Sequence, residues 1–183
     1  MDASVYAYLI LLLGFRWTEN IVMMRTGTFK IRFKMQWTTW VLTALFVIIA
    51  ISPIVEHMHL RTEPGYVSWT LGAIAFVAAT MFRAKGHLDL KKGFSPYIER
   101  TDGQELVDTG LYKHIRHPLY IGTLLMFVAC PLFLASRVSW IFTGLGFAGL
   151  IVRIKVEERF LRDNMDGYKD YMGRTWALIP WIY

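Results

Sequence analysis

Five apolar stretches, separated by polar or charged segments, leave this chain few possible folds. They cover residues 5–24, 38–55, 66–82, 120–134 and 138–152. Hydrophobic residues make up 55% of the 183 positions, which would give a water-soluble domain more apolar surface than it can bury. The pattern predicts an all-α integral membrane protein with a transmembrane helix in each of the five stretches.

The last two stretches are predicted to form a helical hairpin. Both are shorter than the roughly 20 residues that cross a typical hydrocarbon core. Pro131 lies near the end of the first of them, and Ser136 and Arg137 separate the two. We therefore expect the tip of this hairpin barely to emerge from the membrane.

Basic residues predict how the helices are oriented. Segments 25–34, 83–116 and 153–183 hold four, seven and six Lys or Arg, whereas segment 56–65 and the turn at Arg137 hold one each. The positive-inside rule therefore predicts a cytoplasmic C-terminus and an N-terminus outside. Topology and anionic lipid account for the net charge of +6, and without a separate basic domain we expect no nucleic-acid partner.

The long polar segment 84–119 is predicted to form a cap over the cytoplasmic membrane face, because a simple turn would need far fewer residues. Pro118 can occupy the first turn of the next helix, which leaves Arg116 and His117 just outside it. Free backbone N–H groups at that helix start favour an anionic ligand group. We predict a single domain over 1–183, made of three helices in 1–83 and a catalytic region of cap, hairpin and tail in 84–183.

A charged pair on the fifth stretch is a candidate for chemistry. Arg153 and Glu157 are four residues apart, so a helix places them on one face, where they can orient a ligand that carries both charges. The alternative is a simple intrahelical ion pair, worth about 0.2–0.5 kcal/mol. Arg16 and Glu19 pose a similar choice between pairing inside the bundle and extending to the membrane interface.

Two further patterns are interpreted as structural. Gly144-x-Gly146-x-x-Gly149 has the spacing of a dinucleotide-binding loop, but no strand precedes it, so it predicts close helix packing. No metal site is predicted at either of two histidine pairs, because the first has no further ligands nearby and the second precedes a proline within a longer motif. These pairs are His57 with His59 and His114 with His117.

Several motifs follow one another through the second half of the chain. They are Leu106-Val107-Asp108-Thr109-Gly110-Leu111-Tyr112, Arg116-His117-Pro118-Leu119-Tyr120-Ile121-Gly122, the charged run 153–158, Tyr168-x-x-Tyr171 and Ile179-Pro180-Trp181-Ile182. In this order and spacing the chain resembles the isoprenylcysteine carboxyl methyltransferase family of integral membrane enzymes. The Arg-His-Pro-x-Tyr element is also found in phospholipid methyltransferases and sterol reductases.

The resemblance implies that S-adenosylmethionine binds near the cytoplasmic face and that a lipophilic acceptor, most simply a prenylated cysteine carboxylate, enters from the bilayer. It implies that Arg153 contacts the acceptor and Glu157 the cofactor, and that these two carry catalysis. The other cofactor-binding positions that it implies are Gln104, Glu105, Leu106, Val107, Tyr112, His117, Pro118, Leu119 and Tyr120. A carboxylate acceptor is already ionised at neutral pH, so positioning would matter more than a general base.

The residues leave three alternatives open. An enzyme that methylates the amine of a lipid headgroup would need a base, for which His114 and His117 are candidates. A nicotinamide-dependent sterol-type reductase would share the same motif. A non-catalytic membrane scaffold would tolerate alanine at Arg153 and Glu157 without loss of ligand binding. The acidic run, reduced here to Glu157 and Glu158, leaves the acceptor open.

Overall fold

The computed structural model describes residues 3–27, 36–90 and 106–180. Within these ranges the chain is helical and contains no strand, which confirms the predicted all-α class. The helices are α1 (Ala3–Arg25), α2 (Trp37–Leu60), α3 (Tyr66–Leu90), α4 (Pro118–Phe133), α5 (Val138–Asn164) and α6 (Tyr168–Gly173), with a 3-10 turn, η2 (Gly110–Lys113), before α4.

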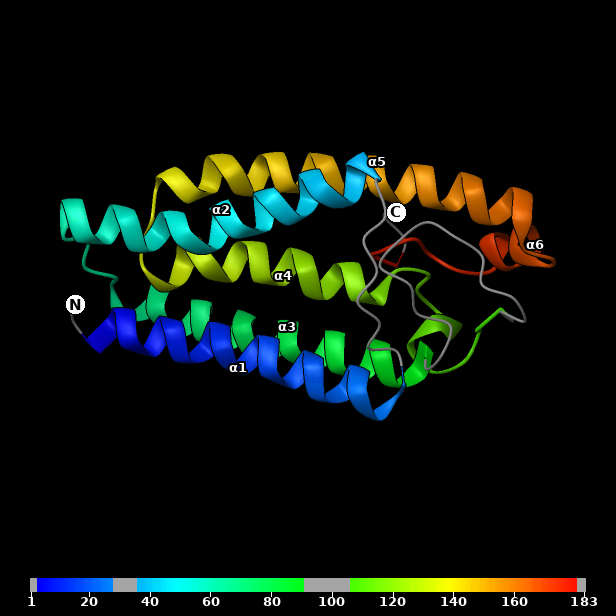
Figure 1. Cartoon of the computed structure of the whole chain (residues 1–183), viewed down its shortest axis with the longest axis horizontal. Coiled ribbons are helices and arrows are strands. Elements are labelled where there is room, and N and C mark those ends of the chain that lie inside the picture. Colours follow the sequence, from blue (N-terminus) through cyan, green and yellow to red (C-terminus); the bar gives the residue numbers. More distant parts are fainter. Residues whose placement is uncertain (1–2, 28–35, 91–105, 181–183) are drawn as a thin grey trace.

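The long helices form an elongated bundle (Figure 1). Helices α2 and α5 lie side by side, as do α1 and α3, and α4 lies between the two pairs. Helix α4 packs most extensively against α3 and also contacts α2 and α5. The turn η2, the short helix α6 and the start of α4 gather at one end, which we call the polar end: the first turn of α4 with residues 106–117 and 153–180.

Four helices, α1, α2, α3 and α5, are long and apolar enough to cross a membrane by length and composition. Helix α4 is apolar but has 16 residues, or about 24 Å at 1.5 Å per residue, against a hydrocarbon core of about 30 Å. Large apolar side chains such as Ile10, Val67 and Ile141 are exposed on the outside of the bundle. An outer surface of this kind is suited to lipid and not to water.

Two helices continue well beyond the apolar stretches that predicted them. Helix α5 runs to Asn164, twelve residues past the end of the stretch at Val152, and α3 runs to Leu90. The added residues include many Arg, Lys and Glu, which are good helix formers that need no lipid contact. The first residues of the predicted cap, 84–90, are therefore the end of a helix, and residues 91–105 lie outside the described part.

Close contacts between helices explain two of the glycines. A Cβ atom on Gly122 of α4 would lie 2.5 Å from Cγ of Arg83 and 3.0 Å from the carbonyl oxygen of Ala79, both on α3. On Gly146 of α5 it would lie 2.7 Å from the Phe127 ring of α4, whereas Gly144 has no neighbouring atom within 4 Å. The packing role predicted from the glycine pattern is thus confirmed at Gly146.

A buried carboxylate fixes the turn between α4 and α5. Glu56 of α2 accepts hydrogen bonds from the Ser136 hydroxyl at 2.5 Å and from the backbone N–H groups of Arg137 and Val138, both at 3.0 Å. Unpaired N–H groups at a helix start need acceptors, and here a neighbouring helix provides them. No local pattern in the sequence predicts this contact, which joins residues about 80 positions apart.

Candidate functional site

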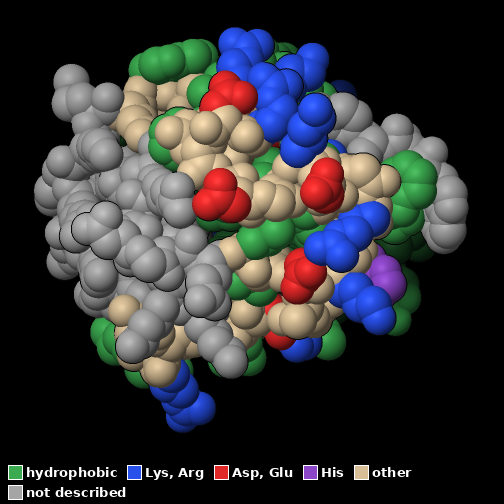
Figure 2. Space-filling model, turned by 90° about the vertical axis from the view of Figure 1, so that its right-hand side faces the viewer, with side chains coloured by type: hydrophobic (Ala, Val, Ile, Leu, Met, Phe, Trp, Pro, Cys, Tyr) green, Lys and Arg blue, Asp and Glu red, His purple; other side chains and the backbone are tan. Residues whose placement is uncertain are grey.

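The polar end brings the sequence motifs together. Figure 2 views the molecule from this end and shows Lys, Arg, Asp and Glu side chains gathered on its surface. Helix α5 carries Arg153 and Glu157, α4 carries Tyr120, and the segment before α4 carries His117. The contacts among these four side chains form the candidate site.

Arg153 is buried between three helices, with 4% of its surface exposed. Its Nη1 donates to the hydroxyl oxygens of Thr38 at 2.6 Å and Thr39 at 2.9 Å, both in the first turn of α2. Its Nε lies 3.4 Å from the hydroxyl oxygen of Tyr120 and 3.9 Å from Oε2 of Glu157. The pair with Glu157 is therefore one part of a larger network, and the guanidinium is held mainly by α2 and α4.

Glu157 is the accessible member of this network. Its carboxylate accepts a hydrogen bond of 2.5 Å from the Tyr120 hydroxyl, and a quarter of its side chain, 25%, remains exposed. The rings of Tyr120 and His117 are stacked, with centroids 5.3 Å apart and planes 13° apart. The site thus combines an exposed carboxylate, a flat aromatic pair and a buried guanidinium.

A second ion pair lies beside this site and was not assigned a role from the sequence. Glu158 accepts from Nε of Arg116 at 2.6 Å and lies 3.2 Å from Nε2 of His117. Arg116 also donates to the carbonyl oxygens of Met172 and Thr175. The arginine that precedes His117 in the motif therefore ties α5 to the segment after α6. Both residues stand within the motifs, so the motif positions were a usable signal.

The segment that contains the Arg-His-Pro motif pairs with the tail through backbone hydrogen bonds. The N–H of Arg116 donates to the carbonyl oxygen of Trp176 at 2.8 Å, and the N–H of His117 donates to that of Ala177 at 3.1 Å. The N–H of Trp176 donates in return to the carbonyl oxygen of His114 at 3.0 Å. These bonds fix the backbone immediately before α4, and with it the ring of His117.

Tyr112 closes the site on the side of η2. Its side chain is buried, and burial, reinforced by the Glu157 carboxylate, raises its pKa well above the usual range. The hydroxyl of Tyr171 donates to the backbone carbonyl oxygen of Tyr112 at 2.6 Å. Tyr112 therefore stays protonated at neutral pH and can serve only as a neutral donor or an apolar wall.

A lock between α3 and η2 determines where Tyr112 sits. The carboxylate of Asp89 accepts from the backbone N–H of Leu111 at 2.9 Å. Gly110 has a φ of +60°, which a glycine adopts without strain, and a Cβ atom there would collide with Asp89. The glycine of the Leu-Val-Asp-Thr-Gly motif thus allows the end of α3 to hold the turn.

The other predicted cofactor positions are placed less uniformly. Leu106 lies close to Gly167, between α5 and α6, and Val107 is half-buried. Pro118 begins α4, as predicted, and is buried. The Leu119 side chain packs against Gly86 of α3. Gln104 and Glu105 lie outside the described residues.

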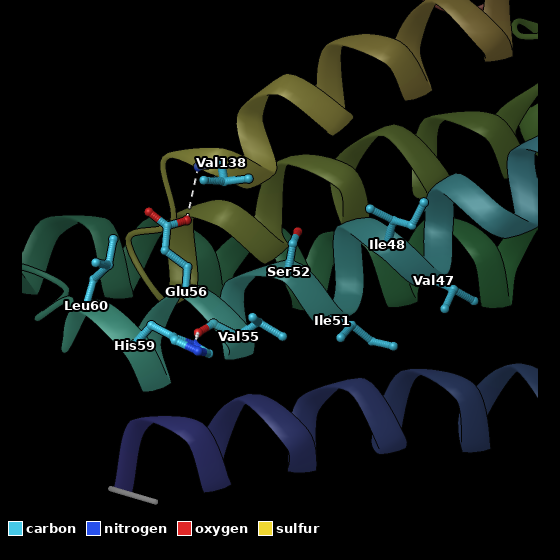
Figure 3. A pocket seen from close by; sticks show the side chains of 9 residues that line it. All are labelled: Val47, Ile48, Ile51, Ser52, Val55, Glu56, His59, Leu60 and Val138. Carbon is cyan, nitrogen blue, oxygen red and sulfur yellow. Dashed lines mark hydrogen bonds between the residues drawn. The ribbon is translucent and has the colours of Figure 1, made fainter.

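An apolar groove lies elsewhere, away from the candidate site. It has a volume of about 550 Å³ and is formed by α2 with the start of α5 (Figure 3). It is lined by Val47, Ile48, Ile51, Ser52, Val55, Glu56, His59, Leu60 and Val138. Glu56 is bonded to the α5 start and Ser52 lies 2.6 Å from Ser139, so its polar groups are already engaged. The groove lies toward the end of α2 that is far from Thr38. Along the helix axis, Glu56 is about 27 Å from Thr38.

A protein-family model matches this chain. The model of the isoprenylcysteine carboxyl methyltransferase family matches residues 70–163, which include α4, most of α5 and the candidate site. A solved structure of a eukaryotic intramembrane Ras methyltransferase, an isoprenylcysteine carboxyl methyltransferase, superposes with a TM-score of 0.77 over 98% of this chain and 67% of that one. At 19% identity, this likeness shows a shared fold.

Curated relatives fall into two groups of enzymes. A protein-S-isoprenylcysteine O-methyltransferase of Dictyostelium discoideum is 31% identical over 121 residues, which are 63% of this chain and 50% of the relative. A methanethiol S-methyltransferase of Mycobacterium tuberculosis is 26% identical over 196 residues, covering 94% of this chain and 77% of the relative. Methanethiol S-methyltransferase 1 of Bradyrhizobium diazoefficiens is 39% identical over 72 residues, covering 39% of this chain and 25% of the relative. The chain spans half the length of the first relative and a quarter of the last.

Proposed function

Because the chain belongs to the isoprenylcysteine carboxyl methyltransferase family, we propose that it transfers a methyl group from S-adenosylmethionine to a lipophilic acceptor in the membrane, with an isoprenylcysteine carboxylate as the first candidate. The observation that carries this proposal is the contact between Tyr120 and Glu157 beside the buried Arg153. It places an available carboxylate and a cation side by side at the end of a membrane-spanning helix.

The residues at the polar end fit S-adenosylmethionine by their chemistry. When bound, this cofactor supplies an activated methyl group attached to a positively charged sulfur. Glu157 provides a partly exposed carboxylate that can accept from its hydroxyl or amino groups, and the stacked rings of His117 and Tyr120 provide a flat surface for an adenine. Buried Tyr112 provides a neutral wall near Glu157. Gln104, Glu105, Leu106, Val107, Pro118 and Leu119 remain proposed members of this pocket.

Arg153 is proposed to orient the acceptor carboxylate. In the structure its Nη1 is held by the hydroxyl groups of Thr38 and Thr39. A carboxylate makes stronger hydrogen bonds with a guanidinium than a neutral hydroxyl does, so an acceptor can compete for these donors. Since a carboxylate is ionised at neutral pH, Arg153 and Glu157 act by holding the two reactants and need not remove a proton.

A second candidate acceptor is methanethiol, because relatives that match this chain are methanethiol S-methyltransferases. A cysteine thiol has an ordinary pKa near 8.5, and an alkanethiol such as methanethiol has a higher one. Methanethiol is therefore mostly protonated at neutral pH, and its methylation requires a proton acceptor. Glu157 and His117 are the groups at the site that can take the proton. Methylation of a lipid amine would impose the same requirement, whereas a sterol-type reductase would require a nicotinamide cofactor.

We propose that the polar end faces the cytoplasm, as the distribution of basic residues predicts. In this arrangement α4 and α5 form a hairpin, α4 serves as a fifth, shorter membrane crossing, and residues 84–183 supply the catalytic region of a single domain. Impermeant maleimide labelling of sealed vesicles tests the orientation, with single cysteines at Arg61 and at Arg174 in a Cys130→Ala background. Labelling of the Arg174 position from the cytoplasmic side alone is expected, and labelling of it from the outside would reverse the proposal.

The cofactor is tested by calorimetric titration of the detergent-purified protein with S-adenosylhomocysteine and, separately, with oxidised and reduced phosphorylated nicotinamide cofactors. Wild type is expected to bind S-adenosylhomocysteine and neither nicotinamide cofactor. Glu157→Ala should bind S-adenosylhomocysteine with an affinity lower by about tenfold or more, because a hydrogen bond to a charged group is lost. Lys155→Ala, at an exposed position on the same helix, is the matched control and should bind like wild type. Binding of the nicotinamide cofactors alone would favour the reductase.

The acceptor is tested by methyl transfer from labelled S-adenosylmethionine to S-farnesylcysteine and to methanethiol. For the carboxylate acceptor, Arg153→Lys should raise KM, because an ammonium group cannot make a two-pronged contact. The rate with S-farnesylcysteine should depend little on pH near neutrality, whereas the rate with methanethiol should rise with pH. Turnover of methanethiol alone would make it the acceptor.

A further inference from the structure

A buried ionic cluster joins α1 to α3 near the polar end. Glu19 of α1 is 4% exposed and accepts from Nε of Arg83 at 2.7 Å and from Nη1 of Arg16 at 2.5 Å. Nη2 of Arg83 also donates to Glu19, and Nε2 of His87 lies 3.3 Å from the same carboxylate. Of the two alternatives for Arg16 and Glu19, the structure supports pairing, with Arg16 itself remaining 56% exposed.

Burying a charged group within a membrane-spanning helix costs free energy, so the partners that stabilise the group indicate why it is kept. The guanidinium of Arg83 extends beyond Glu19 to the first turns of α4. Its Nη1 donates to the Thr123 hydroxyl at 2.8 Å and to the Leu119 carbonyl oxygen at 3.4 Å. The Thr123 hydroxyl donates to the same Leu119 carbonyl at 3.2 Å. Arg83 of α3 is thus bonded to both α1 and α4, with the bonds to Glu19 fixing its rotamer.

The stem of Arg83 is also fitted closely to α4. Gly122 lies opposite its Cγ, where even one additional carbon would be only 2.5 Å away. Leu119 and Thr123, on either side of Gly122 along the helix, accept from the same guanidinium. Helix α4 therefore cannot slide or rotate against α3 without breaking contacts along the whole length of this side chain.

A neighbouring face of the same helix turn carries the candidate site. Tyr120 directly follows Leu119, and its hydroxyl reaches Glu157 at 2.5 Å and Arg153 at 3.4 Å. On the α3 side, Arg83 therefore holds the start of α4 through the Leu119 carbonyl oxygen and the Thr123 hydroxyl. On the α5 side, Tyr120 holds it through its bond to Glu157. A small displacement of α4 on the α3 side would move the Tyr120 hydroxyl relative to Glu157.

We infer that Arg83 is a positioning residue for the site: held by Glu19, it fixes the first turns of α4 through Leu119 and Thr123 and so sets Tyr120 against Glu157. The inference rests on the proposed function in one respect, which is the choice of S-adenosylhomocysteine as the ligand whose affinity is measured. Arg83 touches neither Tyr120 nor Glu157 in this scheme and acts only through α4.

The test is a double-mutant cycle on affinity for S-adenosylhomocysteine. Arg83→Gln should weaken binding about tenfold and Thr123→Val about threefold, while the double variant should bind no more weakly than Arg83→Gln alone. Arg16→Gln is the matched control, because it removes another arginine from Glu19 but has no described contact with α4. It should bind like wild type. Equal affinity of Arg83→Gln and wild type, or additive effects in the double variant, would overturn the inference.

Two measures keep the test decisive. If Arg83→Gln does not fold, Arg83→Lys and Thr123→Val replace it, since lysine keeps the charge beside Glu19 but cannot bridge to α4 with a fork of donors. Spin labels at exposed Lys113 and Lys155, in a Cys130→Ala background, report the geometry without ligand. Their distance distribution should broaden in Arg83→Gln and not in Arg16→Gln. An unchanged distribution contradicts the inference, whereas failure of wild type to bind S-adenosylhomocysteine contradicts the proposed function alone.

Discussion

Tyr120 is the side chain that contacts the other three residues of the candidate site. Its hydroxyl donates to Glu157 and lies within reach of Arg153, while its ring stacks on His117. A phenylalanine at this position would keep the ring and lose both polar contacts. The hydroxyl therefore has a role that can be separated from packing.

We expect Tyr120→Phe to lower kcat/KM for methyl transfer about tenfold, because Glu157 and Arg153 lose a shared partner. The thermal midpoint should fall by only about 2–4 °C, since the ring volume is kept and the loss is confined to the hydrogen bonds of the hydroxyl. Steady-state kinetics with S-adenosylmethionine and the preferred acceptor would measure this. Tyr66→Phe, at an exposed position of α3, is the control. Wild-type kinetics for Tyr120→Phe would mean that the hydroxyl plays no part.

Buried tyrosines at the polar end should make the fold sensitive to alkali. Burial raises the pKa of Tyr171 from 10.0 to about 12 and raises that of Tyr112 and Tyr168 further. A group whose pKa is raised in the folded state contributes stability that is fully present below the unfolded pKa and is lost as pH rises through the folded one. The described polar end should therefore loosen progressively above about pH 10.

Tyr171→Phe should reduce this loss. The variant should be less stable than wild type at pH 8, by about 1 kcal/mol for the lost hydrogen bond to Tyr112, and its thermal midpoint should fall less steeply between pH 10 and 11. Thermal unfolding in detergent across this pH range measures both effects. An equally steep fall in the variant would show that other groups control the alkaline transition.

Among the helices, α5 depends on contacts that differ sharply from one turn to the next. Gly146→Ala should destabilise the bundle by about 1–3 kcal/mol, because the added carbon would meet the Phe127 ring at 2.7 Å. Gly144→Ala, two positions away on the same helix, has open space and a better helix former, so it should be neutral or slightly stabilising. Comparable thermal midpoints for the two variants would contradict the packing described for α4 and α5.

The start of α5 depends on a residue of α2. Glu56→Ala would leave the Ser136 hydroxyl and the N–H groups of Arg137 and Val138 without their carboxylate, and should destabilise the fold by about 2 kcal/mol or more. Glu63→Ala, at an exposed acidic residue between α2 and α3, should have almost no effect. Denaturation in detergent distinguishes them, and equal stability of both variants would remove the assigned role of Glu56.

For the bundle as a whole, the apolar stretches predicted where the membrane helices lie but not where they end. Helices α3 and α5 continue into charged sequence because charged side chains can extend a helix beyond lipid. The fourth apolar stretch was predicted to be short, and α4, with 16 residues, does fall below the length that marks the other four helices as membrane spans. The fifth stretch was equally short, yet α5 has 27 residues. Those boundaries depend on packing that no single stretch contains.

The candidate site could be anticipated only in part for a similar reason. Arg153 and Glu157 are neighbours on one helix, and their proximity follows from spacing. The bonds of Arg116 to Thr175 and of Glu19 to Arg83 join residues 59 and 64 positions apart, respectively. Such contacts form only after the tertiary arrangement is set, so no local pattern predicts them. The resemblance to the family indicated which motif residues matter, but it did not predict these long-range bonds.

The burial of Arg153 against the first turn of α2 has a consequence for how reaction rates must be expressed. Thr38 and Thr39 belong to a helix that is long and apolar enough to span the membrane, so the proposed acceptor with a lipid tail would approach the guanidinium along the bilayer. Its effective concentration is then its mole fraction among lipids and not its amount per volume of buffer. Adding inert lipid vesicles fused with the enzyme's own, at constant total acceptor, should slow turnover by surface dilution, whereas adding buffer should not.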